Sequence, residues 1–381
     1  MRKADLLKEN PLPLPSRVFR TAAMMDAPQL FNDAPPESGP VLPQAPDEAL
    51  RALAARLPRT VRLGTSTWNF PGWRGIVWSR GSALEHLASE GLPAYSASPI
   101  FRTVGLDRNF YRALCAGAFA RFAAQVPEDF RFLVKAPREV TDPCTRSERG
   151  AATGVNPLFL NPHAAVEKFL GPARLGLGAK AGPLVFQFSP VPHPELRTNE
   201  ARIALTERIG DFFEALRAPA DGLLLAAEFR NYELLTPRMV KRLKAAGVRP
   251  VVGLHPAMPG IRRQTEALRY CDAPDSAEGD YWRLAGPLVV RWSLAAHQFY
   301  DTAKTAWAPF GAVRAADPAT RALIASLIAR AARSGVESYL AVNNKAEGCA
   351  PVTVRRIAEI TDRILEEDRP VTPGSGAAAA R

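Results

Sequence analysis

Short apolar runs alternate with longer segments of helical period along most of the chain. Eight of these runs are candidate strands, and most of them are continuous apolar stretches, which is typical of β-strands covered on both faces. The predicted strands are Val61–Ser66, Ile100–Leu106, Phe130–Lys135, Leu184–Phe188, Leu223–Glu228, Val248–Leu254, Leu288–Trp292 and Ser338–Val342. The predicted helices, each with an apolar stripe and a polar face, are Cys115–Gln125, Asn199–Leu216, Thr236–Ala246, Ala319–Arg333 and Val352–Glu367. This alternation predicts βα units around a parallel sheet.

Eight parallel strands can close into a (β/α)8 barrel or open into a doubly wound sheet. No glycine-rich nucleotide fingerprint follows the first predicted strand, so the best sequence argument for the open sheet is absent. We therefore expect one TIM-type barrel domain over residues 60–368. A proline-rich, mostly irregular arm precedes it over residues 1–59, with a short helix over Pro46–Leu57, and a disordered Gly/Ala tail follows over 369–381.

Composition narrows the class of protein. The 381 residues include 49 Lys and Arg against 38 Asp and Glu, and the resulting net charge of +11 favours anionic partners, from phosphate esters to nucleic acid. The four cysteines are far apart, which suits a reducing compartment, and no apolar stretch is long enough to cross a membrane. We expect a cytoplasmic protein that does not bind a membrane.

The segment LGTSTWNFPGW at 63–73 is the most distinctive motif of the chain. It resembles the GTSGW opening of the DUF72 (YecE-like) family. Further matches follow in the same order: NFYR at 109–112, FLVKAPR at 132–138, GPLVFQF at 182–188, EFR at 228–230, and NN at 343–344 with Gly348, Ala350 and Pro351. The resemblance covers residues 61–360 and implies a TIM-type barrel, but it implies no established activity.

This chain departs from the family pattern at three places. The acidic residue that relatives carry after the second strand is replaced by Gly105, and Asp107 stands where they have Asn. Two family histidines are also missing, because the chain has Thr141-Asp142 and Ser293-Leu294 at those positions. His255 and His297 lie near strand ends and could compensate. These differences indicate a subfamily with another substrate, or one that has lost activity.

Barrel enzymes place their chemistry at the carboxyl ends of the strands, so polar side chains at these ends are candidates. As acid/base or other catalytic residues the sequence offers Asp107, Lys135 and Glu228. Candidate substrate contacts are Trp68, Tyr111, Gln187, Arg230, His255, Arg291 and Asn343.

Several roles stay open from the residues alone. Lys135 interrupts an apolar strand, so we expect it to face either Glu228 in a structural ion pair or a bound anion, with Schiff-base or acid/base chemistry as further options. Arg230 and Arg291 can grip a phosphate or carboxylate, or else pair with Asp107 and Glu228. Trp68 is the better aromatic candidate for ligand contact, and Asn343 is either a ligand contact or a turn residue.

The leading hypothesis is therefore binding or acid/base chemistry on a small anionic substrate at the barrel mouth, with Glu228 as general acid or base. A nucleic-acid-associated protein and a non-catalytic binding or regulatory barrel are the alternatives, and whether the chain is an enzyme stays open. The sequence has no HxH or HExxH pair, so no metal site is predicted. It also has no Walker loop and no GxSxG elbow, the motifs of P-loop nucleotide binding and of serine hydrolases. It names no cofactor and no oligomeric state.

Overall fold

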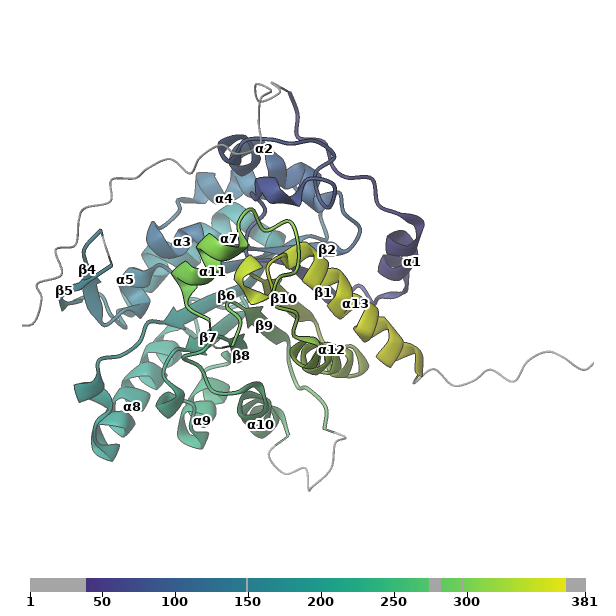
Figure 1. Ribbon diagram of the computed structural model, residues 1–381. Helices are drawn as coiled ribbons and strands as arrows, with labels where there is room; N and C mark the ends of the chain where they lie inside the picture. The colour runs from purple at the N-terminus through teal and green to yellow at the C-terminus, as the bar shows by residue number, and fades with distance from the viewer. Residues whose placement is uncertain (1–38, 149, 274–281, 297, 368–381) are drawn as a thin grey trace, which may run out of the picture. The chain divides into compact units, whose positions relative to one another are not determined.

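Residues 39–148, 150–273, 282–296 and 298–367 are described by the structure, a computed structural model. Eight parallel strands within these ranges form a closed barrel, in the order β1-β10-β9-β8-β7-β6-β3-β2 (Figure 1). The strands are β1 (Val61–Thr65), β2 (Phe101–Leu106), β3 (Arg131–Lys135), β6 (Ala181–Phe188), β7 (Leu225–Phe229), β8 (Arg249–Leu254), β9 (Leu288–Trp292) and β10 (Ser338–Val342). The predicted TIM-type barrel is confirmed, with strand ends shifted by at most a few residues.

Helices surround the strands (Figure 1). The longer ones are α1 (Glu48–Arg56), α2 (Leu84–Ser96), α4 (Ala116–Ala123), α7 (Gly171–Leu177), α8 (Asn199–Leu216), α9 (Pro237–Ala245), α10 (Ile261–Asp272), α12 (Pro318–Arg333) and α13 (Ala350–Glu367). Shorter helices are α3 (Arg108–Tyr111), α5 (Arg138–Thr141), α6 (Pro162–Ala165) and α11 (Tyr300–Trp307), and β4 (Cys144–Arg146) pairs with β5 (Ala152–Val155) as an antiparallel hairpin. All five predicted barrel helices are present.

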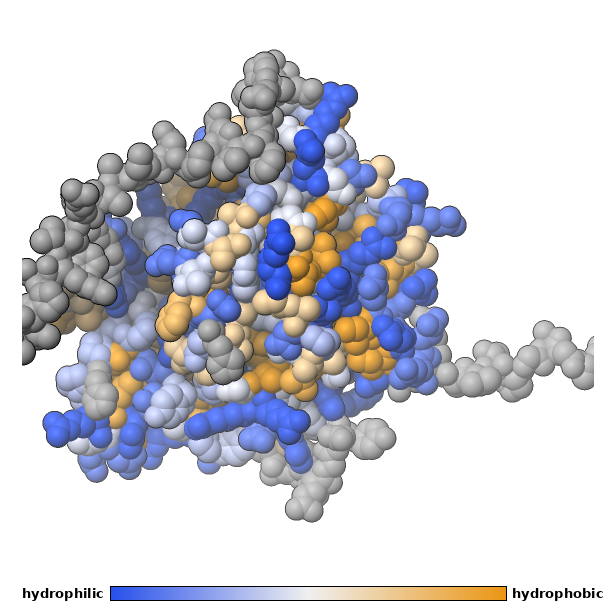
Figure 2. Space-filling view, viewed as in Figure 1, coloured by the Kyte–Doolittle hydropathy of each residue, from blue (hydrophilic) through white to orange (hydrophobic). Residues whose placement is uncertain are grey.

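The barrel helices are amphipathic, as their sequence period predicts. On α9, Met239, Val240 and Leu243 are buried, while the basic residues between them are exposed or half-buried. The surface over α8 to α10, in the lower part of Figure 2, is accordingly largely hydrophilic. None of the helices in the described ranges combines the length and the apolar character that crossing a bilayer requires.

The helix predicted over Pro46–Leu57 is present as α1, and Asp47 caps its amino terminus by accepting a hydrogen bond from the Leu50 amide. Ion pairs at 2.7 and 2.8 Å join Arg56 to Asp362 and Asp47 to Arg355, so α1 is held against α13. Residues 1–38 of the predicted arm and the predicted tail lie outside the described residues, as does His297.

The barrel interior contains its own small apolar cluster, separate from the core between strands and helices. Its six members each come from a different strand: Leu133, Val185, Ala226, Val251, Val289 and Ala341. Side chains alternate across a strand, so the residue two positions further on points into the barrel again, one layer nearer the carboxyl ends. That next layer consists of Lys135, Gln187, Glu228, Gly253, Arg291 and Asn343. The strand periodicity thus places an almost wholly polar layer directly above an apolar one.

Candidate functional site

A cavity of about 290 Å³ lies at the carboxyl ends of the strands. Eight of the ten predicted site residues line it: Asp107, Tyr111, Lys135, Gln187, Arg230, His255, Arg291 and Asn343. Residues that are distant in sequence meet here because every parallel strand ends at the same rim. We call this cavity the mouth.

Glu228 lies beneath the mouth rather than in its wall, and its side chain is fully buried. It receives a hydrogen bond from Nη1 of Arg291, and Nη2 of Arg230 lies 2.8 Å from its Oε1. Burial alone would raise the pKa of Glu228, but the positive charges of Arg291, Arg230 and Lys135 outweigh it and lower the pKa to about 2. A carboxylate so placed stays ionised, and Glu228 is not among the residues that line the mouth.

Arg230, Arg291 and Glu228 form a buried network that Gln187 and Asp107 complete. Gln187 is the direct neighbour of Glu228 across β6 and β7, and its Oε1 accepts hydrogen bonds from Arg230 at 3.0 Å and from Arg291 at 3.2 Å. Nη2 of Arg291 also donates to Oδ1 of Asp107 at 3.2 Å. Of the two readings that the sequence left open for the arginines, pairing with the carboxylates is the one the structure supports.

The network depends on a glycine in the strand between its members. Arg291 pairs in register with Gly253 of β8, and β8 in turn lies beside β7, which carries Glu228. A Cβ atom on Gly253 would lie 3.5 Å from the carboxyl carbon of Glu228 and 2.5 Å from the terminal carbon of Met258. The missing side chain leaves room for the guanidinium of Arg291 to reach across β8.

Lys135 does not pair with Glu228, which corrects the partner expected from the sequence. Within the described residues it has no ion pair, and its Nζ lies 3.9 Å from the centroid of the Phe110 ring. Asn109 fixes this arrangement by donating to the backbone oxygen of Lys135 at 2.7 Å and accepting from the Leu114 amide. Burial lowers the pKa of Lys135 to about 8, against the attraction of Asp107. Lys135 is therefore a mouth cation whose charge no carboxylate directly neutralises.

His255 and Asn343 take positions at the edge of the mouth. Burial, aided by the charge of Arg230, lowers the pKa of His255 to about 4, so the ring is neutral near pH 7. Nδ1 of His255 accepts from the Ala257 amide, which leaves the ring proton on Nε2. Asn343 donates to the Ser66 hydroxyl and accepts from the Lys345 amide. Asn343 therefore stabilises the turn that follows β10, and its side chain also lines the mouth.

Trp68 lies outside the mouth, although the sequence suggested a ligand contact. It is 1% exposed, its indole N–H donates to the backbone oxygen of Leu87 in α2, and its ring packs edge-on against Phe122 of α4. The chain leaves the barrel after Ser66, so the indole packs behind the strands instead of above them.

Sequence reasoning missed several residues of the wall. Ser66 and Ser293 follow strands β1 and β9, and the rule that finds polar residues at strand ends could have included them. Tyr300 comes from α11, eight positions beyond β9, and no local signal placed it there. Among the described residues, no group of three or more His, Cys, Asp or Glu side chains is arranged to hold a metal ion.

A family model described as "Protein of unknown function DUF72" matches residues 62–374. The chain belongs to the DUF72 family. The predicted resemblance is therefore confirmed over most of the sequence, while the family description assigns no activity. No curated protein matches the chain.

The chain is also similar to solved structures. A DUF72 family protein from Enterococcus faecalis V583 superimposes with a TM-score of 0.52 at 15% identity, covering 79% of this chain and 95% of that one. A DUF72 family protein from Thermotoga maritima MSB8 gives a TM-score of 0.49 at 18% identity, covering 80% of this chain and 99% of that one. The first of these similarities supports the fold, and neither identifies a substrate.

Proposed function

We propose that the mouth binds a small anionic molecule, a carboxylate or a phosphate ester, and transfers a proton to or from it. The charge balance supports this proposal. Arg230 and Arg291 pair with Glu228 or Asp107, whereas Lys135, the third cation of the mouth lining, forms no ion pair with any described residue. A buried ammonium is costly unless an opposite charge accompanies it, so a bound anion would complete the cluster.

Two unpaired polar atoms add to this argument. Oε1 of Glu228 and Nη1 of Arg230 are buried without an aligned hydrogen bond in the described part of the chain, although Nη2 of Arg230 lies close to that oxygen. The contact is thus a charge pair with poor hydrogen-bond geometry. Buried polar groups are nearly always satisfied in native proteins, so a small polar ligand that reorients Arg230 would be favoured here.

Proton transfer would fall to Lys135 and Asp107 rather than to Glu228. A group exchanges protons best when its pKa lies near the working pH, and burial brings the pKa of Lys135 to about 8. Asp107 lines the mouth with a side chain 30% exposed, within reach of a ligand. Glu228 would act as a positioning residue that holds the two arginines.

The test is a thermal-shift screen with a library of small phosphates and carboxylates, followed by calorimetric titration of any stabilising compound. We expect the wild type to bind at least one of them and Lys135→Met to bind it at least about tenfold more weakly, because a charged hydrogen bond is worth ~1.5–3 kcal/mol. Lys241→Met, on the outer face of α9, removes the same charge and should bind normally. A wild type that binds no anion, or equal binding by both variants, would overturn the proposal.

A nucleic-acid partner is supported by the net charge of +11 and by the basic, proline-rich arm of the sequence, and the described residues add no observation that favours it. A salt titration with single- and double-stranded DNA and RNA would test that alternative, because phosphate contacts weaken steeply with ionic strength.

A further inference from the structure

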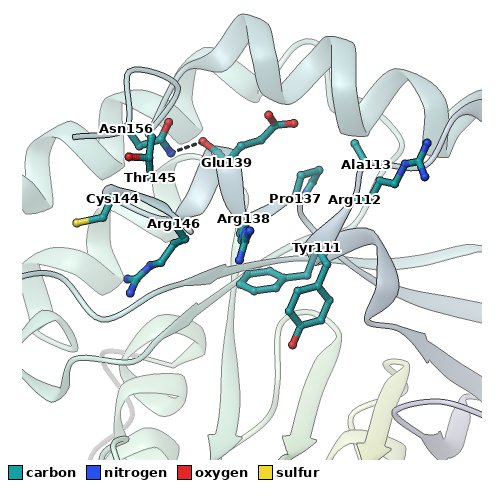
Figure 3. Close-up of a pocket in the computed structure, with 11 residues that line it drawn as sticks. Tyr111, Arg112, Ala113, Pro137, Arg138, Glu139, Cys144, Thr145, Arg146 and Asn156 are labelled. Carbon is teal, nitrogen blue, oxygen red and sulfur yellow. Dashed lines mark hydrogen bonds between the residues drawn. The ribbon is translucent and has the colours of Figure 1, made fainter. Parts of the chain in front are cut away.

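A second cavity, of about 410 Å³, adjoins the mouth and shares the residues Phe110 and Tyr111 with it. We call it the side pocket. It lies over α5 and the β4-β5 hairpin, in the insertion that separates β3 from β6 (Figure 3). Its other lining residues are Arg112, Ala113, Pro137, Arg138, Glu139, Cys144, Thr145, Arg146 and Asn156.

The acidic groups around the side pocket are already paired. Asp142 accepts two hydrogen bonds from Arg146, at 2.9 and 3.1 Å, and Glu139 pairs with Lys168 at 3.0 Å. Arg138 has no ion pair within the described residues. Its charge acts on the Tyr111 hydroxyl, where it opposes the rise in pKa that burial causes. The side pocket therefore contains a guanidinium whose charge is not neutralised.

The position of this guanidinium sets Arg138 apart from Arg112. In Figure 3 the side chain of Arg138 lies beside that of Tyr111 in the middle of the cavity, while the guanidinium of Arg112 is directed away from both. Both arginines line the side pocket, but only the guanidinium of Arg138 lies near Tyr111, so Arg112 serves as a control of the same charge.

Two aromatic rings separate the unpaired cation of the mouth from that of the side pocket. Nζ of Lys135 lies over the Phe110 ring, and Phe110 in turn packs edge-on against Tyr111, with centroids 5.3 Å apart. Tyr111 is 68% exposed, so its ring is accessible to a ligand. Its exposed ring offers a flat surface between the two cations.

We propose that the mouth and the side pocket form one extended binding site for a substrate that carries an anionic group at each end. This inference rests on the proposed function of the mouth. One phosphate or carboxylate would contact Lys135, the other would contact Arg138, and the middle of the molecule would lie across Tyr111. Arg138 then selects ligands with two anionic groups over ligands with one, and its planar fork suits a phosphate or carboxylate.

The experiment compares three probes by calorimetric titration: inorganic phosphate, fructose 6-phosphate and fructose 1,6-bisphosphate. We expect the wild type to bind the bisphosphate at least about tenfold more tightly than the monophosphate, the factor that one added charged hydrogen bond supplies. Arg138→Gln should abolish this preference and leave monophosphate binding unchanged, whereas Arg112→Gln should alter neither. Arg138 forms no ion pair within the described residues, so melting curves should show that the Arg138→Gln variant stays folded.

The possible failures are distinguishable. A wild type that binds the monophosphate through Lys135 but shows no preference for the bisphosphate overturns the extended site and leaves the proposed function standing. An equal loss of both sugar phosphates in Arg138→Gln, or an equal effect in Arg112→Gln, also overturns it. If none of the three probes binds and the phosphate and carboxylate library is also silent, the proposed function fails together with the extended site.

Discussion

Replacing Glu228 by Gln would remove the carboxylate that pairs with both buried arginines, Arg230 and Arg291. Glu228 is 0% exposed at its side chain, and Arg230 and Arg291 are 9% and 4% exposed, so water cannot take over its role. Gln keeps the size and one acceptor oxygen but loses the charge. The variant therefore isolates the electrostatic contribution of the carboxylate from its packing.

The size of the effect follows from the pKa of Glu228. Its decrease from 4.5 to about 2 corresponds to about 3 kcal/mol of folding stability, since a tenfold change in proton affinity is worth ~1.4 kcal/mol. Removing one member of a buried pair costs a similar ~3–5 kcal/mol. Because the pKa is lowered on folding, this stability is fully present above about pH 4.5 and is lost as the pH falls toward 2.

The assay is thermal unfolding of the wild type and Glu228→Gln between pH 3 and pH 7. We expect the variant to melt well below the wild type at pH 7, and the gap to narrow as the pH falls below about 4.5. Asp129→Asn breaks a surface pair with Arg59, whose side chains are 82% and 53% exposed, and should cost under ~1 kcal/mol.

A double variant shows where the cost arises. If Glu228→Gln destabilises by leaving Arg291 unpaired, adding Arg291→Met should restore part of the loss. Strictly additive effects, or a Glu228→Gln protein as stable as the wild type, would refute the buried network.

Three further outcomes are expected. Any anion that binds through Lys135 should lose affinity as the pH rises through about 8, because the ammonium is then deprotonated, and calorimetry of wild type and Lys135→Met from pH 6 to 9 would measure this. Trp68→Ala should lower stability by ~3–5 kcal/mol in denaturant titrations without changing anion affinity, since the indole is buried behind the barrel. Gly64→Ala should destabilise severely or prevent folding, because its Cβ would meet the backbone oxygen of Thr103 in β2. Gly81→Ala should be tolerated, and the soluble yield and melting temperature of the two variants would measure the difference.

The barrel could be predicted because its strands are buried on both faces and most of them therefore appear as largely apolar runs. Elements whose residues show no clear hydrophobic pattern were not predicted. Helix α2 contains Gly91 and Pro93, which weaken a helical pattern, and α10 has few apolar residues in its twelve positions. The β4-β5 hairpin is largely exposed and offers no hydrophobic alternation.

Eight of the ten residues predicted from the sequence line the mouth, but the sequence did not predict which charged side chains pair. The rule that polar residues at strand ends face the mouth holds for Lys135 and Arg291, but it cannot tell which charges pair. Pairing depends on barrel register, and the role of Gly253 as an open gap between Glu228 and Arg291 appears only when β8 is placed between β7 and β9. The rule does not hold for Trp68, because a residue that follows a strand can turn outward as easily as toward the mouth.

The stacking of a polar layer on an apolar one has an evolutionary consequence. Each residue of the polar layer follows, two positions later on the same strand, an apolar residue of the cluster that fills the barrel interior. Lys135 thus lies above Leu133, and Asn343 lies above Ala341. Substitution in the polar layer therefore leaves the filling below intact. Polar groups at the carboxyl ends of the strands can thus differ between relatives while the apolar filling of the barrel stays the same. Asp107 and Ser293, two places where this chain departs from the family pattern, directly follow β2 and β9 at those ends.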